Sequence, residues 1–248
     1  MDLRQQRVFI TGGTSGIGLA LAKQLDARGA RVAVCGRSEE RLAQLVAAHP
    51  QIHAIRADLS IVDELPALVD ALLADFGAPS VLVNNAGMQR NDMWTDLEAA
   101  ERVDAVRREV TVNLTSPLAL TGLLLDALQT HPRPVVVNIT SALAWKPKRS
   151  APVYCATKAG LRSFTEGMRD QMEAGGQPVR VVEVVPPLVE TAMTAGRGRG
   201  KISADEAARQ IVSGLERGSD RVLVGKTKLL SVLYRLSPSL VGRILRSG

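Results

Sequence analysis

A phenol and an ammonium group stand four residues apart in Tyr154-Cys-Ala-Thr-Lys158, a spacing that places both side chains on one face of a helix. A tyrosine exchanges protons near neutral pH only where its pKa is held far below its usual value, which takes about 4 kcal/mol. An ammonium about 4 Å away, in a medium of dielectric constant about 20, supplies roughly that much. The pair can therefore handle a proton. Ser141 adds a hydroxyl at the end of the apolar run that precedes the pair.

Four glycines lie in TGGTSGIG, residues 11–18, directly after the apolar run Val8-Phe9-Ile10. In a strand-to-helix turn, Gly12, Gly16 and Gly18 permit a tight turn and close approach of the backbone to a pyrophosphate. The helix that follows directs the positive end of its dipole at the same place. Such turns also join strands to helices for packing reasons alone, so this signal needs support from elsewhere in the chain.

The elements that position these residues alternate along the chain. Short apolar runs predict strands at 7–11, 31–35, 53–57, 81–84, 135–140, 179–185 and 221–224, and helical spacing predicts helices at 17–28, 39–48, 62–75, 99–130, 152–174 and 204–217. Nearly continuous apolar strands are typical of parallel sheets that are covered on both faces. The chain is therefore predicted to be α/β, with a doubly wound Rossmann-type parallel sheet of about seven strands and helices on both faces.

Composition narrows the function classes. The chain has 248 residues, 46% of them apolar, which is typical of one domain over 1–248. Two cysteines, no apolar leader and no segment that reaches the length of a membrane-spanning helix lead us to expect a cytoplasmic protein. A net charge of +6 with only 3% aromatic residues favours anionic small molecules over nucleic acid. The three histidines lack metal-ligand spacing, so no metal is expected.

Taken together and in this order, the glycine turn, Asn84-Asn85-Ala86-Gly87, Ser141 and Tyr154-x-x-x-Lys158 resemble the short-chain dehydrogenase/reductase family. The resemblance runs from residue 7 to about residue 225. It implies that Tyr154 is a general acid and base, that Ser141 holds the substrate oxygen, and that Lys158 binds the nicotinamide ribose. It further implies that Asn113 kinks the long helix 99–130 and keeps a proton-relay water beside Lys158. Each of these side chains alone has an ordinary structural interpretation, as a hydrated helix residue or a cap.

The family's cofactor contacts are carried over residue by residue. They fall on Gly12, Thr14, Ser15, Gly16, Ile17, Gly18, Arg37, Asp58, Leu59, Asn85, Ala86, Gly87, Tyr154, Lys158, Pro186 and Thr191. At the end of the second strand, Gly36 stands where an acidic residue would accept from a ribose hydroxyl, and Arg37 follows it. A guanidinium can bind a phosphate, which favours NADP(H), with NAD(H) as the alternative. The negative charges of Glu39 and Glu40 count against NADP(H), because they would repel its phosphate. The objection fails if Ser38 caps a helix whose first turn holds both glutamates away from the cofactor.

The chain departs from the family after the sixth strand, where it has Pro186-Pro187 in place of Pro-Gly. A second proline removes an N–H and stiffens the loop that enters the substrate site. Residues 192–202 are expected to form a mobile substrate loop, whose Arg197, Arg199 and Lys201 either meet an acidic group or keep the loop soluble. Apolar surface for a hydrophobic or ring-bearing ketone is expected from Met88 and from Leu143, Trp145, Leu188 and Met193.

The predicted function is that of an NADP(H)-dependent oxidoreductase which interconverts a carbonyl and a secondary alcohol. The alternative is a dinucleotide-sensing protein on the same fold without turnover. The resemblance implies a small-molecule substrate and a homodimer or homotetramer formed through helices 99–130 and 152–174. Residues 226–248 are expected to be a helical tail that packs on the domain or across a subunit interface rather than on a membrane surface.

Overall fold

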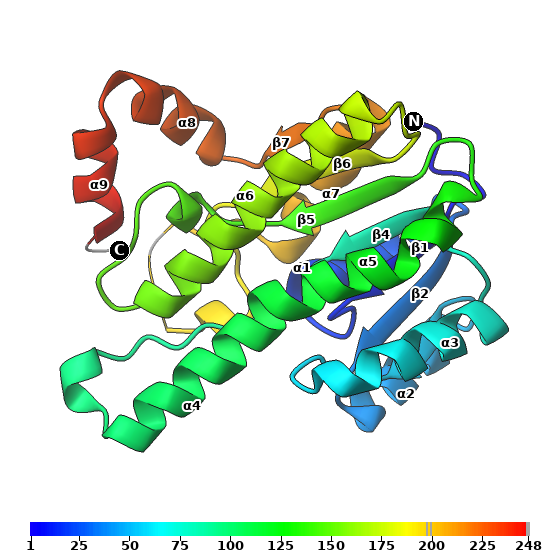
Figure 1. Ribbon diagram of the computed structural model, residues 1–248, viewed down its shortest axis with the longest axis horizontal. Coiled ribbons are helices and arrows are strands. Elements are labelled where there is room, and N and C mark those ends of the chain that lie inside the picture. The colour runs from blue at the N-terminus through cyan, green and yellow to red at the C-terminus, as the bar shows by residue number, and fades with distance from the viewer. Residues whose placement is uncertain (197, 199, 247–248) are drawn as a thin grey trace.

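The computed structural model describes residues 1–196, 198 and 200–246 (Figure 1). These residues form a seven-stranded, wholly parallel sheet in the order β3-β2-β1-β4-β5-β6-β7. Its strands are β1 (Arg7–Thr11), β2 (Arg31–Gly36), β3 (His53–Arg56), β4 (Val81–Asn84), β5 (Val135–Ile139), β6 (Arg180–Val185) and β7 (Arg221–Leu223). From β1 to β3 the strands are added toward one edge of the sheet, and from β4 to β7 toward the other, so the order of addition reverses between β1 and β4. Ligands of such sheets bind at that point, beyond the carboxyl ends of the strands.

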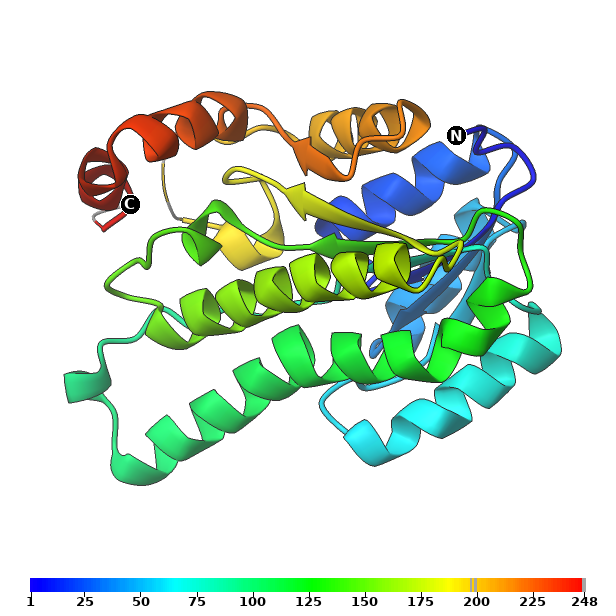
Figure 2. The ribbon, with the colours of Figure 1, turned by 45° about the horizontal axis from the view of Figure 1, so that its top comes forward.

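Helices cover both faces of the sheet, which explains the valine-rich strands (Figure 2). On one face, α1 (Gly16–Asp26), α2 (Glu39–Ala48) and α7 (Ala204–Glu216) pack Leu21 and Ile211 against Ile10. On the other face, α3 (Leu65–Asp75), α5 (Ser116–Gln129) and α6 (Pro152–Ala174) pack Leu72 and Leu124 against Phe9. Successive side chains of β1 therefore enter opposite cores, as the period of a strand requires.

The predicted helix 99–130 is continuous but not uniform. It consists of α4 (Ala99–Val110), one turn of π-helix, η3 (Thr111–Thr115), and α5. By length and composition alone, Ala99–Gln129 could cross a membrane, so the expectation that no segment reaches that length is wrong. In the fold its second half packs against β4, β5, α3 and α6, which is the position of a core helix.

The chain beyond β7 forms α8 (Thr227–Leu236) and α9 (Pro238–Arg246). Both lie beyond the carboxyl ends of β5–β7, away from the two sheet faces (Figure 1). Single 3₁₀ turns complete the described elements: η1 (Val62–Glu64), η2 (Trp94–Asp96), η4 (Ala142–Ala144) and η5 (Ala192–Thr194). The first three residues of the predicted helix 62–75 form η1, and α3 begins at Leu65. The remaining predicted strand and helix limits agree with the observed ones to within a residue or two, the usual scatter of element ends.

Candidate active site

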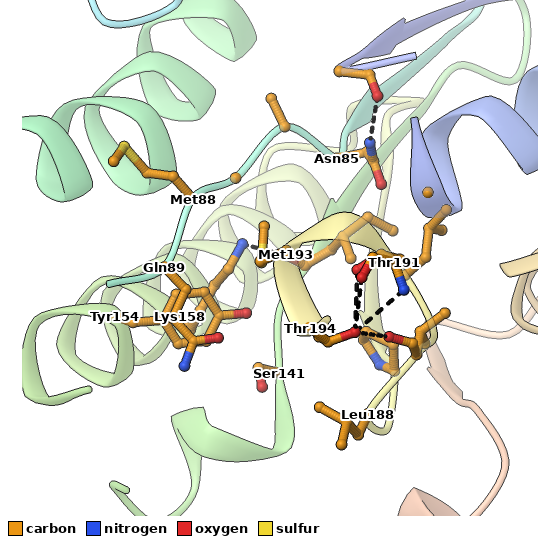
Figure 3. Close-up of a pocket in the computed structure, with 18 of the residues that line it drawn as sticks. Asn85, Met88, Gln89, Ser141, Tyr154, Lys158, Leu188, Thr191, Met193 and Thr194 are labelled. Carbon is orange, nitrogen blue, oxygen red and sulfur yellow. Dashed lines mark hydrogen bonds between the residues drawn. The ribbon is translucent and has the colours of Figure 1, made fainter. Parts of the chain in front are cut away.

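A cavity of about 1190 Å³ opens at the carboxyl ends of the strands (Figure 3). It has two halves. The nucleotide half is lined by the turns after β1, β2, β3 and β4, and the substrate half by η4, residues 186–194, α8 and α9. Most of the predicted site residues line it: Gly12, Thr14, Ser15, Gly16, Ile17, Arg37, Asp58, Leu59, Asn85, Ala86, Gly87, Met88, Ser141, Leu143, Tyr154, Lys158, Pro186, Leu188, Thr191 and Met193.

The glycine turn leaves no room for side chains. Gly16 has φ +53, and a Cβ built there would lie 2.9 Å from Cγ2 of Thr191, across the mouth of the cavity. A Cβ on Gly18 would lie 2.4 Å from Nδ2 of Asn85, so this glycine serves packing of α1 on the strands. Gly18 does not line the cavity among the described residues, and its contact with the cofactor stays a prediction. The first-turn N–H groups of α1 have no partners within a helix and can serve an anion.

The two asparagines that end β4 have different roles. Asn84 is buried, and its Nδ2 donates to Oδ1 of Asn138 on β5 at 2.8 Å. Asn85 turns the other way, and its Nδ2 donates to the carbonyl oxygens of Thr11 at 2.9 Å and of Gly12 at 3.3 Å; Figure 3 draws the second bond. Oγ1 of Thr11 in turn accepts from the N–H groups of Asn85 and Ala86, both at 3.0 Å. These bonds lock the end of β4 to the end of β1, at the point where the sheet order reverses.

The turn after β2 presents positive charge to the nucleotide half. Oγ of Ser38 accepts from the N–H of Arg41 at 3.3 Å and caps α2, as predicted. Glu39 lies 3.3 Å from Arg56 rather than in the cavity. Arg41 joins Arg37 in the lining. The sequence analysis missed Arg41; the signal available was a second arginine in the first turn of the helix that Ser38 caps, directly after the end of β2.

Asp58 is held as a carboxylate in the same half. Burial raises its pKa, but hydrogen bonds from the N–H and hydroxyl of Ser60 and the charge of Arg37 outweigh this and hold the pKa below its usual value. The two bonds to Oδ1 measure 2.9 and 2.8 Å. Its orientation is therefore set before any ligand arrives.

Tyr154, Lys158 and Ser141 come together at the junction of the two halves (Figure 3). Tyr154 and Lys158 lie one turn apart on α6, with Nζ of Lys158 5.8 Å from the centre of the tyrosine ring. Only 4% of Lys158 is exposed, and its Nζ donates to the carbonyl oxygen of Ile139 at 2.9 Å. Burial lowers the pKa of Lys158 from 10.5 to about 8. The ammonium remains the main form at neutral pH but loses its proton far more readily than a surface lysine.

Asn113 stands in the π-helical turn and does not line the cavity. Its Oδ1 accepts from the N–H of Met88 and its Nδ2 donates to the carbonyl oxygen of Met88, both at 2.8 Å. A Cβ on Gly87 would lie 3.4 Å from Oδ1 of Asn113 and 3.7 Å from Nζ of Lys158, so the amide and the ammonium flank this glycine. The kink expected of Asn113 is thus a π-turn, a feature common at functional sites.

The substrate half departs most from the sequence prediction. Trp145 is 8% exposed and does not line the cavity, because it is buried against Tyr234 of α8 with ring centres 5.9 Å apart. Nζ of Lys201 donates to the carbonyl oxygen of Thr194, whereas Arg197 and Arg199 lie outside the described residues. The sequence analysis missed the lining residues Lys226, Leu229, Leu230, Leu233 and Leu245, because nothing in the sequence placed α8 and α9 over the cavity.

The family model of short chain dehydrogenases matches residues 6–201. The chain belongs to the short-chain dehydrogenase family. Among its relatives, the uncharacterized oxidoreductase DltE of Bacillus subtilis (strain 168) is 35% identical over 229 residues, which cover 90% of this chain and 89% of DltE. This membership makes the chain an oxidoreductase.

Two solved structures of the family carry bound dinucleotides. A short chain dehydrogenase from Burkholderia cenocepacia J2315, in complex with NADP, superposes with a TM-score of 0.86 at 25% identity and covers all of both chains. A family member from Burkholderia phymatum, in complex with NAD, has a TM-score of 0.84 at 21% identity and covers 95% of this chain and 94% of its own, a likeness of fold. Within the described residues of the present chain, no cluster of three His, Cys, Asp or Glu side chains could hold a metal ion.

Proposed function

We propose that this family member uses NADP(H) to interconvert a carbonyl compound and a secondary alcohol, with Tyr154 as the proton donor and acceptor. The observation that carries the proposal is the convergence of Tyr154, Lys158 and Ser141 at the junction between a glycine-lined half and an apolar half of one cavity. A proton-transferring group is useful only where substrate and cofactor meet. This junction is such a place.

The nucleotide half fits a nicotinamide dinucleotide. Gly12 and Gly16 line this half with φ +67 and +53, and without side chains they would let backbone N–H groups approach a pyrophosphate. Added Cβ atoms there would also meet Ala86 and Thr191 at 3.0 and 2.9 Å. When bound, the dinucleotide supplies or accepts the hydride. Residues of the turn after β1 and the N-terminus of α1 would hold its phosphates, and residues 85–87 would adjoin its ribose.

The side chains at the junction have matching hydrogen-bond capacities. Oγ of Ser141 accepts from the N–H of Leu143 at 3.1 Å, so its own hydrogen is directed elsewhere and can bind the substrate oxygen. Lys158 uses one N–H on Ile139 and keeps two, for the nicotinamide ribose and the neighbourhood of the phenol. Tyr154 then donates a proton to the carbonyl oxygen in reduction and accepts one from the alcohol in oxidation.

The preference for NADP(H) is supported by charge. Arg37 and Arg41 line the cavity beside Gly36, where no carboxylate would repel a 2′-phosphate. Glu39 is paired with Arg56, which removes the main objection to a phosphate there. Guanidinium groups bind phosphates through paired hydrogen bonds. The neighbour from B. cenocepacia carries NADP, and the one from B. phymatum carries NAD.

The decisive experiment follows NADPH oxidation by absorbance with a panel of ketones and aldehydes. In Tyr154→Phe we expect kcat to fall by about 10²- to 10⁴-fold while the Kd for NADPH stays unchanged. The other tyrosine of the chain provides a matched control, because Tyr234 stacks on Trp145 and does not line the cavity. Tyr234→Phe should retain activity. Unchanged turnover in Tyr154→Phe would refute the role of the phenol, and NADPH binding without any turnover would favour the dinucleotide sensor.

We also propose a homo-oligomer formed through the faces of α4–α5 and α6. Val103, on α4, is 69% exposed and Leu123, on α5, is 42% exposed, so these helices have apolar side chains that a partner subunit would cover. Light scattering after gel filtration should give a multiple of 26.5 kDa. A monomer mass at micromolar concentration would rule this out.

A further inference from the structure

We propose that the substrate of this reductase carries an apolar chain that lies beneath the two C-terminal helices. The proposal rests on the function proposed above and names its substrate class. Three leucines from these helices, Leu230, Leu233 and Leu245, line the cavity opposite Leu188 and Met193. The segment 188–193 and the two helices are separate in sequence, and their side chains together make an apolar wall that suits a hydrocarbon chain.

The charges of the lining argue against a cationic substrate tail. Asp58 is the sole acidic residue among the described lining residues, and it lies in the nucleotide half. Besides its apolar side chains, the substrate half has hydroxyl groups, such as those of Thr194 and Thr227, and the two cations Lys148 and Lys226. An ammonium group buried there would meet like charges and no carboxylate of the described lining, at a considerable energetic cost. A hydrocarbon chain incurs no such cost.

The volume of the cavity also calls for a second ligand besides the dinucleotide. At about 1190 Å³ it exceeds the roughly 300–1,000 Å³ of most small-molecule sites. The apolar surface continues outward along α8, where Leu229 at the rim is 66% exposed. A chain longer than the enclosed space can therefore extend along the helix without meeting a polar barrier.

The helix that forms this wall is fixed to the domain. Oγ1 of Thr227, at the start of α8, donates to the carbonyl oxygens of Val185 and Val224 at 2.9 and 2.8 Å. Tyr234 stacks on Trp145, and Val241 of α9 is fully buried. Trp145 thus contributes to the substrate half indirectly, by holding the wall in place.

The test measures kcat/KM with NADPH for methyl ketones of increasing chain length, from four to twelve carbons. Each added methylene group that is buried against the wall should raise kcat/KM by about fourfold, until the enclosed space is filled. Leu233→Gln should flatten this rise, because it places an amide in the wall that the chain would contact. Leu236→Gln is the matched control on the same helix, since Leu236 is 79% exposed and outside the lining, and the rise should persist.

Calorimetry with Tyr154→Phe loaded with NADPH separates the two proposals, because ketone binding is then read without turnover. If short ketones are reduced but chain length has no effect on rate or binding, the reductase function stands and the apolar-chain proposal is overturned. If long ketones bind more tightly than short ones but the wild type never reduces them, the chain site stands and the function fails. Equal effects of Leu233→Gln and Leu236→Gln would also overturn the proposal.

A different observation concerns a buried carboxylate that the proton-transfer step does not use. Glu109, on α4, is 2% exposed, and its Oε1 accepts from the N–H of Arg90 at 2.5 Å. The helix that carries it, α4, packs against α6, which carries Tyr154. Burial raises the pKa of Glu109, while hydrogen bonds from the backbone N–H groups of Arg90 and Tyr154 act in the opposite direction. We infer that Glu109 is a positioning residue for Tyr154.

The start of α6 explains why such a residue is needed. Its N-cap, Ala151, has no side-chain acceptor, and its first residue, Pro152, has no N–H. Glu109 gives the N–H of Tyr154 an acceptor and places an acidic group at the positive end of the helix dipole. One turn further along the same long helix, Asn113 holds Met88. The two side chains thus tie the loop at 88–90 and the start of α6 to a single helix.

Glu109→Ala should lower kcat at least about tenfold with an unchanged Kd for NADPH, and amide hydrogen exchange at the start of α6 should become faster. Glu109→Gln keeps an acceptor and should restore kcat to within about threefold of the wild type. Glu101→Ala is the control, an exposed carboxylate on α4 that caps only its own helix. If Glu109→Ala loses stability but keeps wild-type kcat and slow exchange at Tyr154, the positioning role is refuted, whether or not the proposed function holds.

Discussion

The two halves of the cavity are built in different ways. The nucleotide half consists of short turns directly after β1, β2, β3 and β4, and much of its surface is backbone. The substrate half gathers η4, residues 186–194 and the helices α8 and α9, which meet only through side-chain packing such as Trp145 on Tyr234. The nucleotide half thus depends on backbone geometry that few residue types can adopt. The substrate half depends on apolar side-chain surfaces that many different sequences could form.

The largest effect should come from a side chain added to the nucleotide half. Gly16→Val forces a β-branched residue into φ +53 and against Thr191 at 2.9 Å. We expect the Kd for NADPH to rise by at least about 100-fold, measured by calorimetry on protein whose circular dichroism is unchanged. Gly167→Ala is the control, because nothing lies within 4 Å of a Cβ there. Binding within threefold of the wild type in Gly16→Val would show that the turn does not touch the dinucleotide.

The cofactor preference depends on the charges after β2. Replacing both Arg37 and Arg41 by glutamine should weaken NADPH about tenfold to 100-fold and leave NADH within about twofold, because only the 2′-phosphate is affected. Arg56→Gln should change neither, since Arg56 pairs with Glu39 outside the cavity. Equal losses for NADPH and NADH would contradict the assignment. Fluorescence titration gives both constants.

At the junction, Lys158→Met should stabilise the protein while removing activity. Burial lowers the pKa of Lys158 from 10.5 to about 8. Between pH 8 and pH 10.5 the folded protein therefore binds fewer protons than the unfolded chain. The free energy of unfolding of the wild type therefore rises with pH across that window. At pH 7 the variant should be more stable by about 1–3 kcal/mol, and the gap should close by about pH 10. Urea denaturation at several pH values checks this, and a gap that widens with pH would contradict it.

The smallest effect should come from the loop of the substrate half. Pro187→Gly frees a residue that packs near Gly225 and should cost about 0.4–1 kcal/mol in the free energy of unfolding. The KM of the carbonyl substrate should rise about twofold to fivefold, because the more flexible loop loses more conformational entropy when the substrate binds. The Kd for NADPH should not change. A parallel loss of NADPH affinity would show that the halves are coupled through this loop.

The accuracy of the sequence analysis follows the same division. The limits of β1 and β4 and the placement of Gly16, Ser38, Tyr154 and Lys158 could be predicted, because period, capping and positive φ are local constraints. Trp145 was placed wrongly and Glu109 was missed, because both depend on helices that are distant in sequence. A buried glutamate on a helix has no local signature that separates it from an exposed one.

The sequence by itself determined a parallel α/β sheet and the order in which its chemistry-bearing residues follow the strands. It could do so because backbone hydrogen bonding and side-chain periodicity act over a few residues. The tertiary structure alone decided that Lys158 is buried against a carbonyl, that Asn113 binds Met88, and that α8 and α9 wall the cavity. These outcomes depend on packing between segments that are remote in sequence. The free energy of that packing is distributed over many contacts, so no single residue of the sequence indicates it.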